Sequence, residues 1–227
     1  MKTYTVAQMR AAEAPYLAKD VPLMARAAAA LADVAADLLQ PRGGVTGARL
    51  LVLVGPGNNG GDALHAAAIL GRQGAIVTVV ATDERMHPAG LAAVRAAGAA
   101  VLGVDLPAAD LAAAAAASAM IIDGILGTGV SANPALRGRA REVVAAIRPV
   151  LHGPTAPLVL AVDLPSGVGA NDGAVPEPTV LPADVTVTFG GCKPGLLLEP
   201  AAGLVGRIVV ADIGIGDELD RITGARG

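Results

Sequence analysis

Cysteine, aromatic residues and lysine are all scarce in this 227-residue chain. A single cysteine, Cys192, excludes an internal disulfide and is typical of a protein from a reducing compartment. Aromatic residues make up only 1% of the chain, so the core has to be built from the aliphatic residues that dominate its 53% hydrophobic fraction. Small side chains of this kind suit close packing of helices on a sheet.

The chain also lacks the features of nucleic-acid and membrane proteins. Its net charge is −3, its basic residues are scattered, and there is no aromatic stacking platform, so we expect no nucleic-acid partner. The longest apolar run, residues 111–122, is well below the 20 or so residues that span a bilayer. No apolar run follows the first charged residues, so we expect no signal peptide and predict a cytoplasmic protein without a membrane segment.

Apolar strand-like runs alternate with helical patterns along the whole chain. Strands are expected at 49–54, 75–81, 100–104, 120–122, 158–162, 185–189 and 207–211. Helices are expected at 6–13, 22–39, 62–71, 88–97, 106–117 and 136–147, with none between the last two strands. This alternation predicts an α/β fold with a mostly parallel sheet, formed by residues 1–227 as a single domain whose polar tail, 217–227, is frayed.

The first chemically informative segment is Gly55 to Asp62, where Gly55, Gly57 and Gly60 form a G-x-G-x-x-G pattern between a strand and a helix. Such glycines let backbone N–H groups approach a phosphate at the start of the helix. Asp83 follows at the distance of a ribose-binding acid, which keeps an NAD-dependent oxidoreductase as an alternative. A tight turn without ligand is the structural alternative.

Asp62 does not fit the plain phosphate-binding pattern, because it places a carboxylate close to the expected diphosphate. Two interpretations are open: Asp62 caps the helix, or it belongs to a polar site that holds more than a phosphate.

Two further loops begin with an aspartate at the end of an apolar strand. Asp123 precedes Gly127-Thr128-Gly129, and Asp163 precedes Pro165-Ser166-Gly167. Two such carboxylates at one sheet edge suit acid–base chemistry or a hard cation, although capped turns would give the same pattern. The histidines lack zinc-ligand spacing. Lys193 either contacts a substrate phosphate or is a solvated loop lysine.

These motifs, in this order, resemble the NAD(P)H-hydrate epimerases, the YjeF N-terminal domain family. The resemblance is carried by residues 58–62, by Asp123 with 127–129, by 163–167, and by Thr188-Phe189-Gly190 with Lys193-Pro194-Gly195, and it runs from about Thr5 to Gly214. It departs from the family at Ala63 and Gly124, where Gly and Ala are more usual, and after Gly167.

The resemblance implies a three-layer αβα Rossmann-like sandwich, usually a homodimer, that epimerises the R and S forms of hydrated NADH and NADPH (NADHX and NADPHX) at C6 of the nicotinamide ring. An ADP- or ATP-dependent hydrate dehydratase would be the functional partner. Non-catalytic dinucleotide binding is a further alternative, against which the retention of Asp123, Asp163 and Ser166 argues.

The resemblance also assigns residues. A potassium ion would be held by Asn59, Asp123 and Ser166. Because Asp123 is then committed to the cation, Asp163 is the carboxyl left for proton transfer and is the predicted catalytic residue. The substrate-binding residues would be Asn58, Asn59, Gly60, Gly61, Asp62, Gly127, Thr128, Gly129, Val130, Ser131, Ala132, Asn133 and Asp163.

Overall fold

A seven-stranded sheet forms the centre of the protein in the computed structural model, which describes residues 1–129 and 133–224. All neighbouring strands pair in parallel, in the order β3-β2-β1-β4-β5-β6-β7. The strands are β1 (Arg49–Val54), β2 (Ile76–Ala81), β3 (Ala100–Leu102), β4 (Met120–Gly124), β5 (Leu158–Val162), β6 (Val185–Phe189) and β7 (Arg207–Ala211). The predicted parallel sheet is confirmed.

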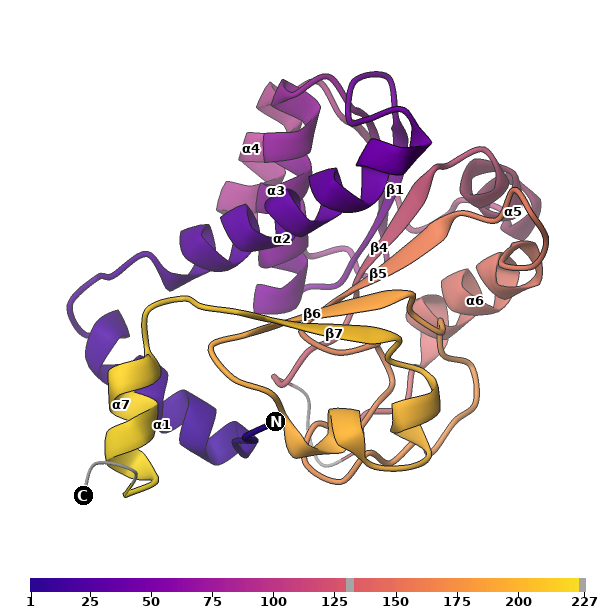
Figure 1. Ribbon diagram of the computed structural model, residues 1–227. Coiled ribbons are helices and arrows are strands. Elements are labelled where there is room, and N and C mark those ends of the chain that lie inside the picture. The colour runs from indigo at the N-terminus through magenta and orange to yellow at the C-terminus, as the bar shows by residue number, and fades with distance from the viewer. Residues whose placement is uncertain (130–132, 225–227) are drawn as a thin grey trace.

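Helices cover both faces of the sheet and give the predicted three layers (Figure 1). One face carries α2 (Leu23–Leu39), α3 (Asn58–Arg72) and α4 (Pro88–Ala96), and the other carries α5 (Ala108–Ala116) and α6 (Gly138–Ile147). Short 3₁₀ turns lie at Gln40–Arg42, Arg148–Val150, Pro194–Leu197 and Ala201–Gly203.

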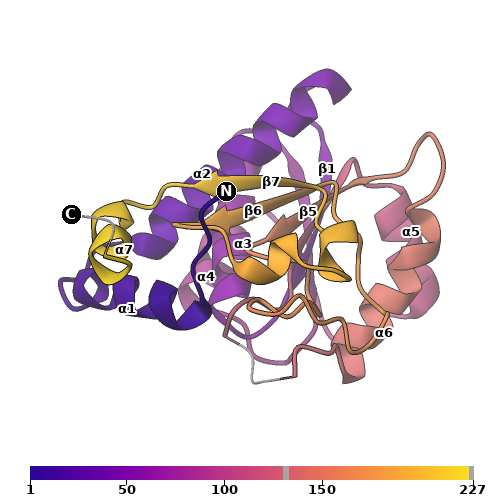
Figure 2. The same cartoon turned by 60° about the horizontal axis from the view of Figure 1, so that its bottom comes forward.

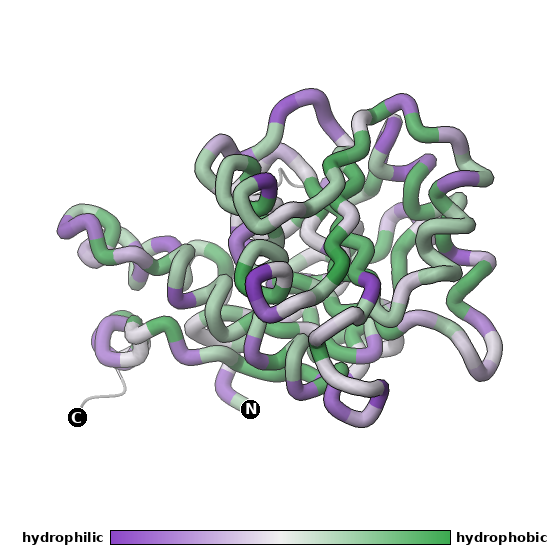
Figure 3. Tube along the Cα trace, turned by 90° about the horizontal axis from the view of Figure 1, so that it is seen from above, coloured by the Kyte–Doolittle hydropathy of each residue, from purple (hydrophilic) through white to green (hydrophobic). Residues whose placement is uncertain are grey.

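The strand sequences are apolar throughout because both faces of the sheet are covered. In β1, Leu50, Val52 and Val54 pack in the core beneath α2 and α3, whereas Leu51 and Leu53 pack beneath α5 and α6. All five side chains are at most 1% exposed. Figure 3 shows hydrophobic residues gathered along the central part of the trace.

Two helices lie outside the three layers, where α1 (Val6–Leu17) packs beside α7 (Gly216–Ile222) (Figure 2). Thr5 begins α1 with a capping box, in which its side chain accepts a hydrogen bond from the N–H of Gln8 while the Gln8 side chain accepts one from the N–H of Thr5.

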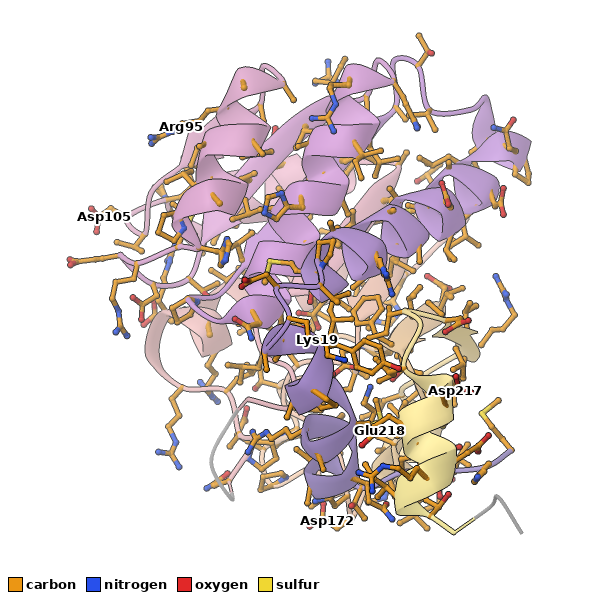
Figure 4. The ribbon with its side chains drawn as sticks, turned by 90° about the vertical axis from the view of Figure 1, so that its left-hand side faces the viewer. Lys19, Arg95, Asp105, Asp172, Asp217 and Glu218 are labelled. Carbon is orange, nitrogen blue, oxygen red and sulfur yellow. The ribbon has the colours of Figure 1, made fainter. Side chains whose placement is uncertain are left out.

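The expectation of a frayed tail from residue 217 is wrong for the residues that form α7. Leu219 is only 1% exposed, and Lys2 forms an ion pair with Asp220 at 3.1 Å. Figure 4 shows this face, with Asp217 and Glu218 on α7 beside α1. A helix of mostly polar residues is held here by one buried leucine and its contact with α1.

The order of the strands decides where a ligand can bind. The chain proceeds outward from β1 to β3 on one side, and then returns through β4 and proceeds outward to β7 on the other. In open α/β sheets the crevice at such a reversal, beyond the carboxyl ends of the strands, is the usual ligand site. No helix in the described ranges 1–129 and 133–224 is long and apolar enough to cross a membrane.

Candidate active site

A cavity of about 620 Å³ lies at the carboxyl ends of β1, β4, β5 and β6, next to the reversal in strand order. Segments that follow these strands form one wall, and α1 and the start of α2 form the other. The lining residues are Met9, Arg10, Glu13, Ala14, Leu17, Leu23, Met24, Ala27, Pro56, Gly57, Asn58, Asn59, Asp62, Ile125, Leu126, Gly127, Thr128, Gly129, Asp163, Phe189, Lys193 and Ile213. The polar groups of the first wall therefore face a largely apolar roof, formed by α1 and the start of α2.

Close backbone packing explains two of the three glycines after β1. A Cβ atom on Gly55 would lie 1.9 Å from the carbonyl oxygen of Ile125, and one on Gly60 would lie 2.2 Å from the carbonyl oxygen of Gly55. Gly57, the N-cap of α3, has open space instead. The turn thus presents bare backbone to the cavity at the beginning of a helix, as phosphate binding requires.

The helix after this turn begins at Asn58, four residues earlier than predicted, so residues 58–62 form its first turns rather than a loop. Asn59 donates a hydrogen bond from Nδ2 to the carbonyl oxygen of Leu126 at 2.9 Å, which fixes α3 against the segment after β4. Asp62 is the fifth residue of α3, and Gly57 is the N-cap. The capping interpretation of Asp62 is therefore wrong.

Asp123, at the end of β4, is fully buried and bound to Ser166. Its Oδ1 accepts hydrogen bonds from Ser166 Oγ at 2.6 Å and from the N–H of Ile125 at 3.3 Å, and its Oδ2 accepts one from the N–H of Ser166 at 2.9 Å. Burial raises the pKa of Asp123, and the hydrogen bonds from Ser166 and Ile125 oppose that rise. The carboxyl group is thus almost completely satisfied by protein donors.

The three residues predicted to hold a potassium ion meet around one backbone segment. Asn59 and Ser166 both contact Leu126, and Ser166 contacts Asp123. They bring together carboxylate, amide, hydroxyl and carbonyl oxygens, which is the donor chemistry that hard cations prefer. The residues therefore fit a hard cation, the class to which the predicted potassium ion belongs. In the described part of the chain, no group of three or more His, Cys, Asp or Glu residues is placed to hold a metal.

Asp163, at the end of β5, forms a different kind of site. Its Oδ1 accepts hydrogen bonds from Lys193 Nζ at 2.5 Å and from Thr188 Oγ1 at 3.1 Å. Lys193 also donates to Thr188 Oγ1 at 2.9 Å and to the carbonyl oxygen of Phe189 at 3.1 Å. Lys193 is only 3% exposed. The interpretation of a solvated loop lysine is wrong, because Lys193 is the buried cationic partner of Asp163.

The backbone of Asp163 is strained. Its φ of +67° lies in the left-handed region, which aspartate tolerates better than most residues but which still costs about 1–3 kcal/mol. Its N–H donates to the carbonyl oxygen of Val187 at 2.7 Å, so pairing with β6 holds this conformation. Strain of this kind is concentrated at functional sites.

Two more carboxyl groups line the same cavity. Asp62 is 9% exposed, and burial raises its pKa well above the usual value, with smaller contributions in the same direction from Asp163 and Glu13. Burial also raises the pKa of Glu13, which Lys193 counteracts. Lys193 is thus the one cation whose field opposes both shifts.

The contribution of α1 was missed by sequence reasoning. Arg10 and Glu13 reach the cavity from this helix, and Arg10 Nη2 donates a hydrogen bond to the carbonyl oxygen of Thr128 at 2.9 Å. The only available signal was that the resemblance begins at about Thr5 and so includes this helix. Nothing in the local sequence places this helix over a sheet edge formed by much later residues.

Most of the predicted substrate residues lie on the cavity wall, but not all. Gly60 and Gly61 are buried behind it, and Asn133 is not among the lining residues. Val130, Ser131 and Ala132 lie outside the described residues. Asp83, the predicted ribose-binding acid of the oxidoreductase alternative, is also absent from the lining and pairs with Arg85 instead.

The departures at Ala63 and Gly124 explain each other. A Cβ atom on Gly124 would lie 2.5 Å from the Cβ of Ala63, so an alanine fits at only one of the two positions. The exchange of Gly and Ala between them keeps α3 and β4 equally close.

Known proteins resemble this chain over most of its length. The profile of the family described as "YjeF-related protein N-terminus" matches residues 13–195. A Clavibacter sepedonicus protein named NAD(P)H-hydrate epimerase is 52% identical over 93% of this chain and 90% of its own length. A Microbacterium testaceum protein of the same name is 45% identical over 96% and 80%.

A longer relative and a solved structure extend the comparison. The Mycobacterium tuberculosis protein named bifunctional NAD(P)H-hydrate repair enzyme Nnr is 40% identical over 93% of this chain but only 41% of its own length. The crystal structure of yeast ynu0 superposes with a TM-score of 0.73 at 21% identity, covering 86% of this chain and 83% of that one. This likeness confirms the fold.

Proposed function

The chain belongs to the family of YjeF-related protein N-termini, and we propose that it is an NAD(P)H-hydrate epimerase, an isomerase of metabolite repair. Its reaction interconverts the R and S forms of NADHX and NADPHX at C6 of the nicotinamide ring. The observation that carries this proposal is the 45–53% identity to proteins of that name over more than nine-tenths of the chain. The cavity supports it, because glycine-rich backbone and strand-end carboxyl groups line one space.

The cavity offers different chemistry to the two ends of such a substrate. The diphosphate would lie against the turn at Gly57 and the first N–H groups of α3, where the helix dipole favours an anion. The hydrated nicotinamide ring would then extend toward Asp163, past the apolar side chains of Met9 and Met24. Residues 127–129 would close one side of the cavity, where Arg10 of α1 donates its hydrogen bond to the carbonyl oxygen of Thr128.

Epimerisation requires a C–O bond to break and re-form on the other face of the ring. A proton is transferred to the C6 hydroxyl, the C6–O bond breaks, and water departs while the N1 lone pair forms a C6=N1⁺ double bond. Water then adds to C6 from the opposite face and loses a proton to a base, which restores the N1 lone pair. Asp163 is the proposed proton-transfer residue, and its carboxylate also stabilises the cationic intermediate.

A potassium ion is the proposed cofactor, held by Asn59, Asp123 and Ser166. When bound, its positive charge offsets the repulsion between the carboxyl groups and the substrate diphosphate. Rubidium-soaked crystals test this assignment through anomalous scattering. A peak between these three residues is expected, and its absence would count against the cation.

The oligomeric state, the cellular location and the partner enzyme belong to the same proposal. The chain would act as a homodimer in the cytoplasm and would pass the S hydrate to an ADP- or ATP-dependent dehydratase. The family includes relatives named bifunctional repair enzymes, of which this chain matches only part, and this supports a linked partner activity.

The test of function is chiral separation of the two hydrate epimers. We expect the purified protein to speed their interconversion and to leave fresh NADH unchanged. Equal epimer lifetimes with and without protein would overturn the proposal. Steady oxidation of NADH with carbonyl substrates would instead favour the oxidoreductase alternative.

A further inference from the structure

Asp62 is a buried carboxyl group that faces the cavity without a bonding partner. It lines the cavity wall and is 9% exposed, yet among residues 1–129 and 133–224 it takes part in no hydrogen bond or ion pair. Asp123, by contrast, accepts three hydrogen bonds. The Asp62 carboxyl oxygens are not among the buried side-chain atoms that lack a partner, so they are accessible from the cavity and can bond with a ligand held there.

The surroundings of Asp62 are unfavourable for a carboxylate. The charged groups whose fields reach it are Asp163, Glu13 and Lys193, of which two are acidic. Lys193 cannot serve it, because the three donors of its ammonium group are already directed to Asp163, Thr188 and Phe189. Asp62 also lies in the second turn of α3, where the effect of the helix dipole has largely decayed.

Asp62 therefore holds its proton at pH values where an ordinary aspartate has lost it. Burial raises its pKa well above the usual value, and the neighbouring carboxyl groups raise it further. Asp163, in contrast, carries the ion pair with Lys193 at 2.5 Å. Two carboxyl groups whose environments differ in this way are the pattern of an acid and a base that act together.

From this arrangement we propose that Asp62 is a second catalytic residue, which donates a proton to the departing C6 hydroxyl while Asp163 accepts a proton from the returning water. The inference rests on the proposed epimerase function. The Asp62 O–H bond breaks as the proton joins the C6 oxygen, and the C6–O bond breaks to release water. After water adds to C6, one of its O–H bonds breaks and the proton passes to Asp163.

Because one residue donates the proton and the other accepts one, the reaction can run in both directions. One turnover leaves Asp62 ionised and Asp163 protonated, which is the state in which the reverse epimerisation begins. Proton exchange with solvent restores the starting state. It also explains why a carboxyl group is tolerated near a diphosphate, because neutral Asp62 does not repel it.

The test compares Asp62→Asn with the wild type and with Asp83→Asn, a control on the same sheet edge that lies outside the cavity lining. Initial rates of interconversion of purified R and S hydrates of NADH are measured from pH 5 to 9. We expect Asp62→Asn to lower kcat by about 10²- to 10⁴-fold, the usual range for one acid–base group. The wild-type rate should fall at high pH as Asp62 loses its proton, and the variant should lack this fall.

Two results would overturn the inference, and they distinguish its failure from failure of the proposed function. If the wild type interconverts the epimers and Asp62→Asn stays within a few-fold of it with the same pH profile, Asp62 is not the acid. If the wild type itself is inactive, the proposed function fails and the acid role with it.

A direct titration guards against a misfolded variant. Carbon-13 NMR of aspartate-labelled wild-type protein, with Asp62→Asn for assignment, reports the ionisation of the Asp62 carboxyl group. A midpoint well above that of an exposed aspartate supports the inference, and an ordinary midpoint contradicts it. Asp62→Glu, which keeps a carboxyl group, should retain more activity than Asp62→Asn.

Discussion

Asp123 and Asp163 end adjacent parallel strands, yet their surroundings differ in nearly every respect. Asp123 is 0% exposed and accepts all of its hydrogen bonds from neutral donors, of which Ser166 provides two. Asp163 is paired with a buried ammonium group, lines the cavity and has a strained backbone. The same local pattern, an apolar strand followed by aspartate, thus gives a carboxyl group held by neutral hydrogen bonds in one case and an ion-paired group on the cavity wall in the other.

The chemistry of such a carboxyl group is therefore decided by its bonding partner and not by its position at the end of a strand. Ser166 lies 43 residues after Asp123 and satisfies its carboxyl group without charge. Lys193 lies 30 residues after Asp163 and supplies a positive charge. Three substitutions test this contrast between Asp123 and Asp163, and a fourth tests the raised pKa of Asp62 beside them.

The largest effect is expected for Asp163→Asn. The variant keeps the size of the side chain but removes its ability to exchange a proton, so kcat should fall by about 10²- to 10⁴-fold. Because the substrate still contacts the rest of the cavity, KM should change far less. Epimerisation kinetics below the melting temperature of the variant measure both, and a rate within a few-fold of wild type would place the catalytic group elsewhere.

Removing the positive charge of Lys193 should have the next largest effect. Lys193→Met leaves the Asp163 carboxylate buried without its ion-pair partner, and loss of one member of such a pair costs about 3–5 kcal/mol of unfolding free energy. Urea denaturation measures the loss. The double variant Lys193→Met/Asp163→Asn should recover much of it, since no unpaired charge remains. If the double variant is no more stable than Lys193→Met, the ion-pair account fails.

A smaller loss of stability is expected for Ser166→Ala. The change leaves Asp123 Oδ1 with one hydrogen bond fewer and the N–H of Leu126 without its acceptor, which corresponds to about 1–3 kcal/mol. The same denaturation experiment applies, with Ser118→Ala as a matched control, because Ser118 lies just after α5 and its Oγ donates to the carbonyl oxygen of Ala114 at 2.7 Å. Equal losses of unfolding free energy in the two serine variants would mean that the hydrogen bonds of Ser166 to Asp123 and Leu126 stabilise the fold no more than those of an ordinary serine.

The smallest expected effect is a change in how stability depends on pH. Below about pH 3.9, Asp62 is protonated in both the folded and unfolded chains. Above it, the unfolded chain loses this proton before the folded chain does, because burial raises the folded-state pKa, so the stability contribution of Asp62 falls as pH rises through that window. Asp62→Asn should therefore gain stability relative to wild type as pH increases from 4. Parallel stability curves would contradict the raised pKa.

The sequence predicts those features that depend on local pattern. The strand at 49–54, the glycine turn at Gly55 and the aspartates at strand ends are visible because each rests on a few neighbouring residues. Parallel strands then bring these ends together at one edge without further information.

The remaining features depend on contacts between distant segments. Residues 58–61 are two asparagines and two glycines, which are weak helix formers, so only their packing against β1 and β4 starts α3 at Asn58. Lys193 could not be assigned to Asp163 because its loop has no regular pattern to set its position. Glu13 and Arg10 reach the cavity only because α1 docks there.

The docking of α1 also has a consequence for how the protein is made. Its N-terminal end is held by late parts of the chain: the N–H of Val6 donates to Asn171 Oδ1 at 2.9 Å. In the segment just before the helix, the N–H of Tyr4 donates to the carbonyl oxygen of Cys192 at 2.8 Å, and Lys2 pairs with Asp220 at 3.1 Å. At about 5–20 residues per second, a ribosome needs about 10–40 s to synthesise the stretch between Tyr4 and Cys192. This helix leaves the ribosome before any strand of the sheet and is among the last elements to find its place, so a nascent chain that already holds β1 to β5 has no helix α1 fixed over the cavity.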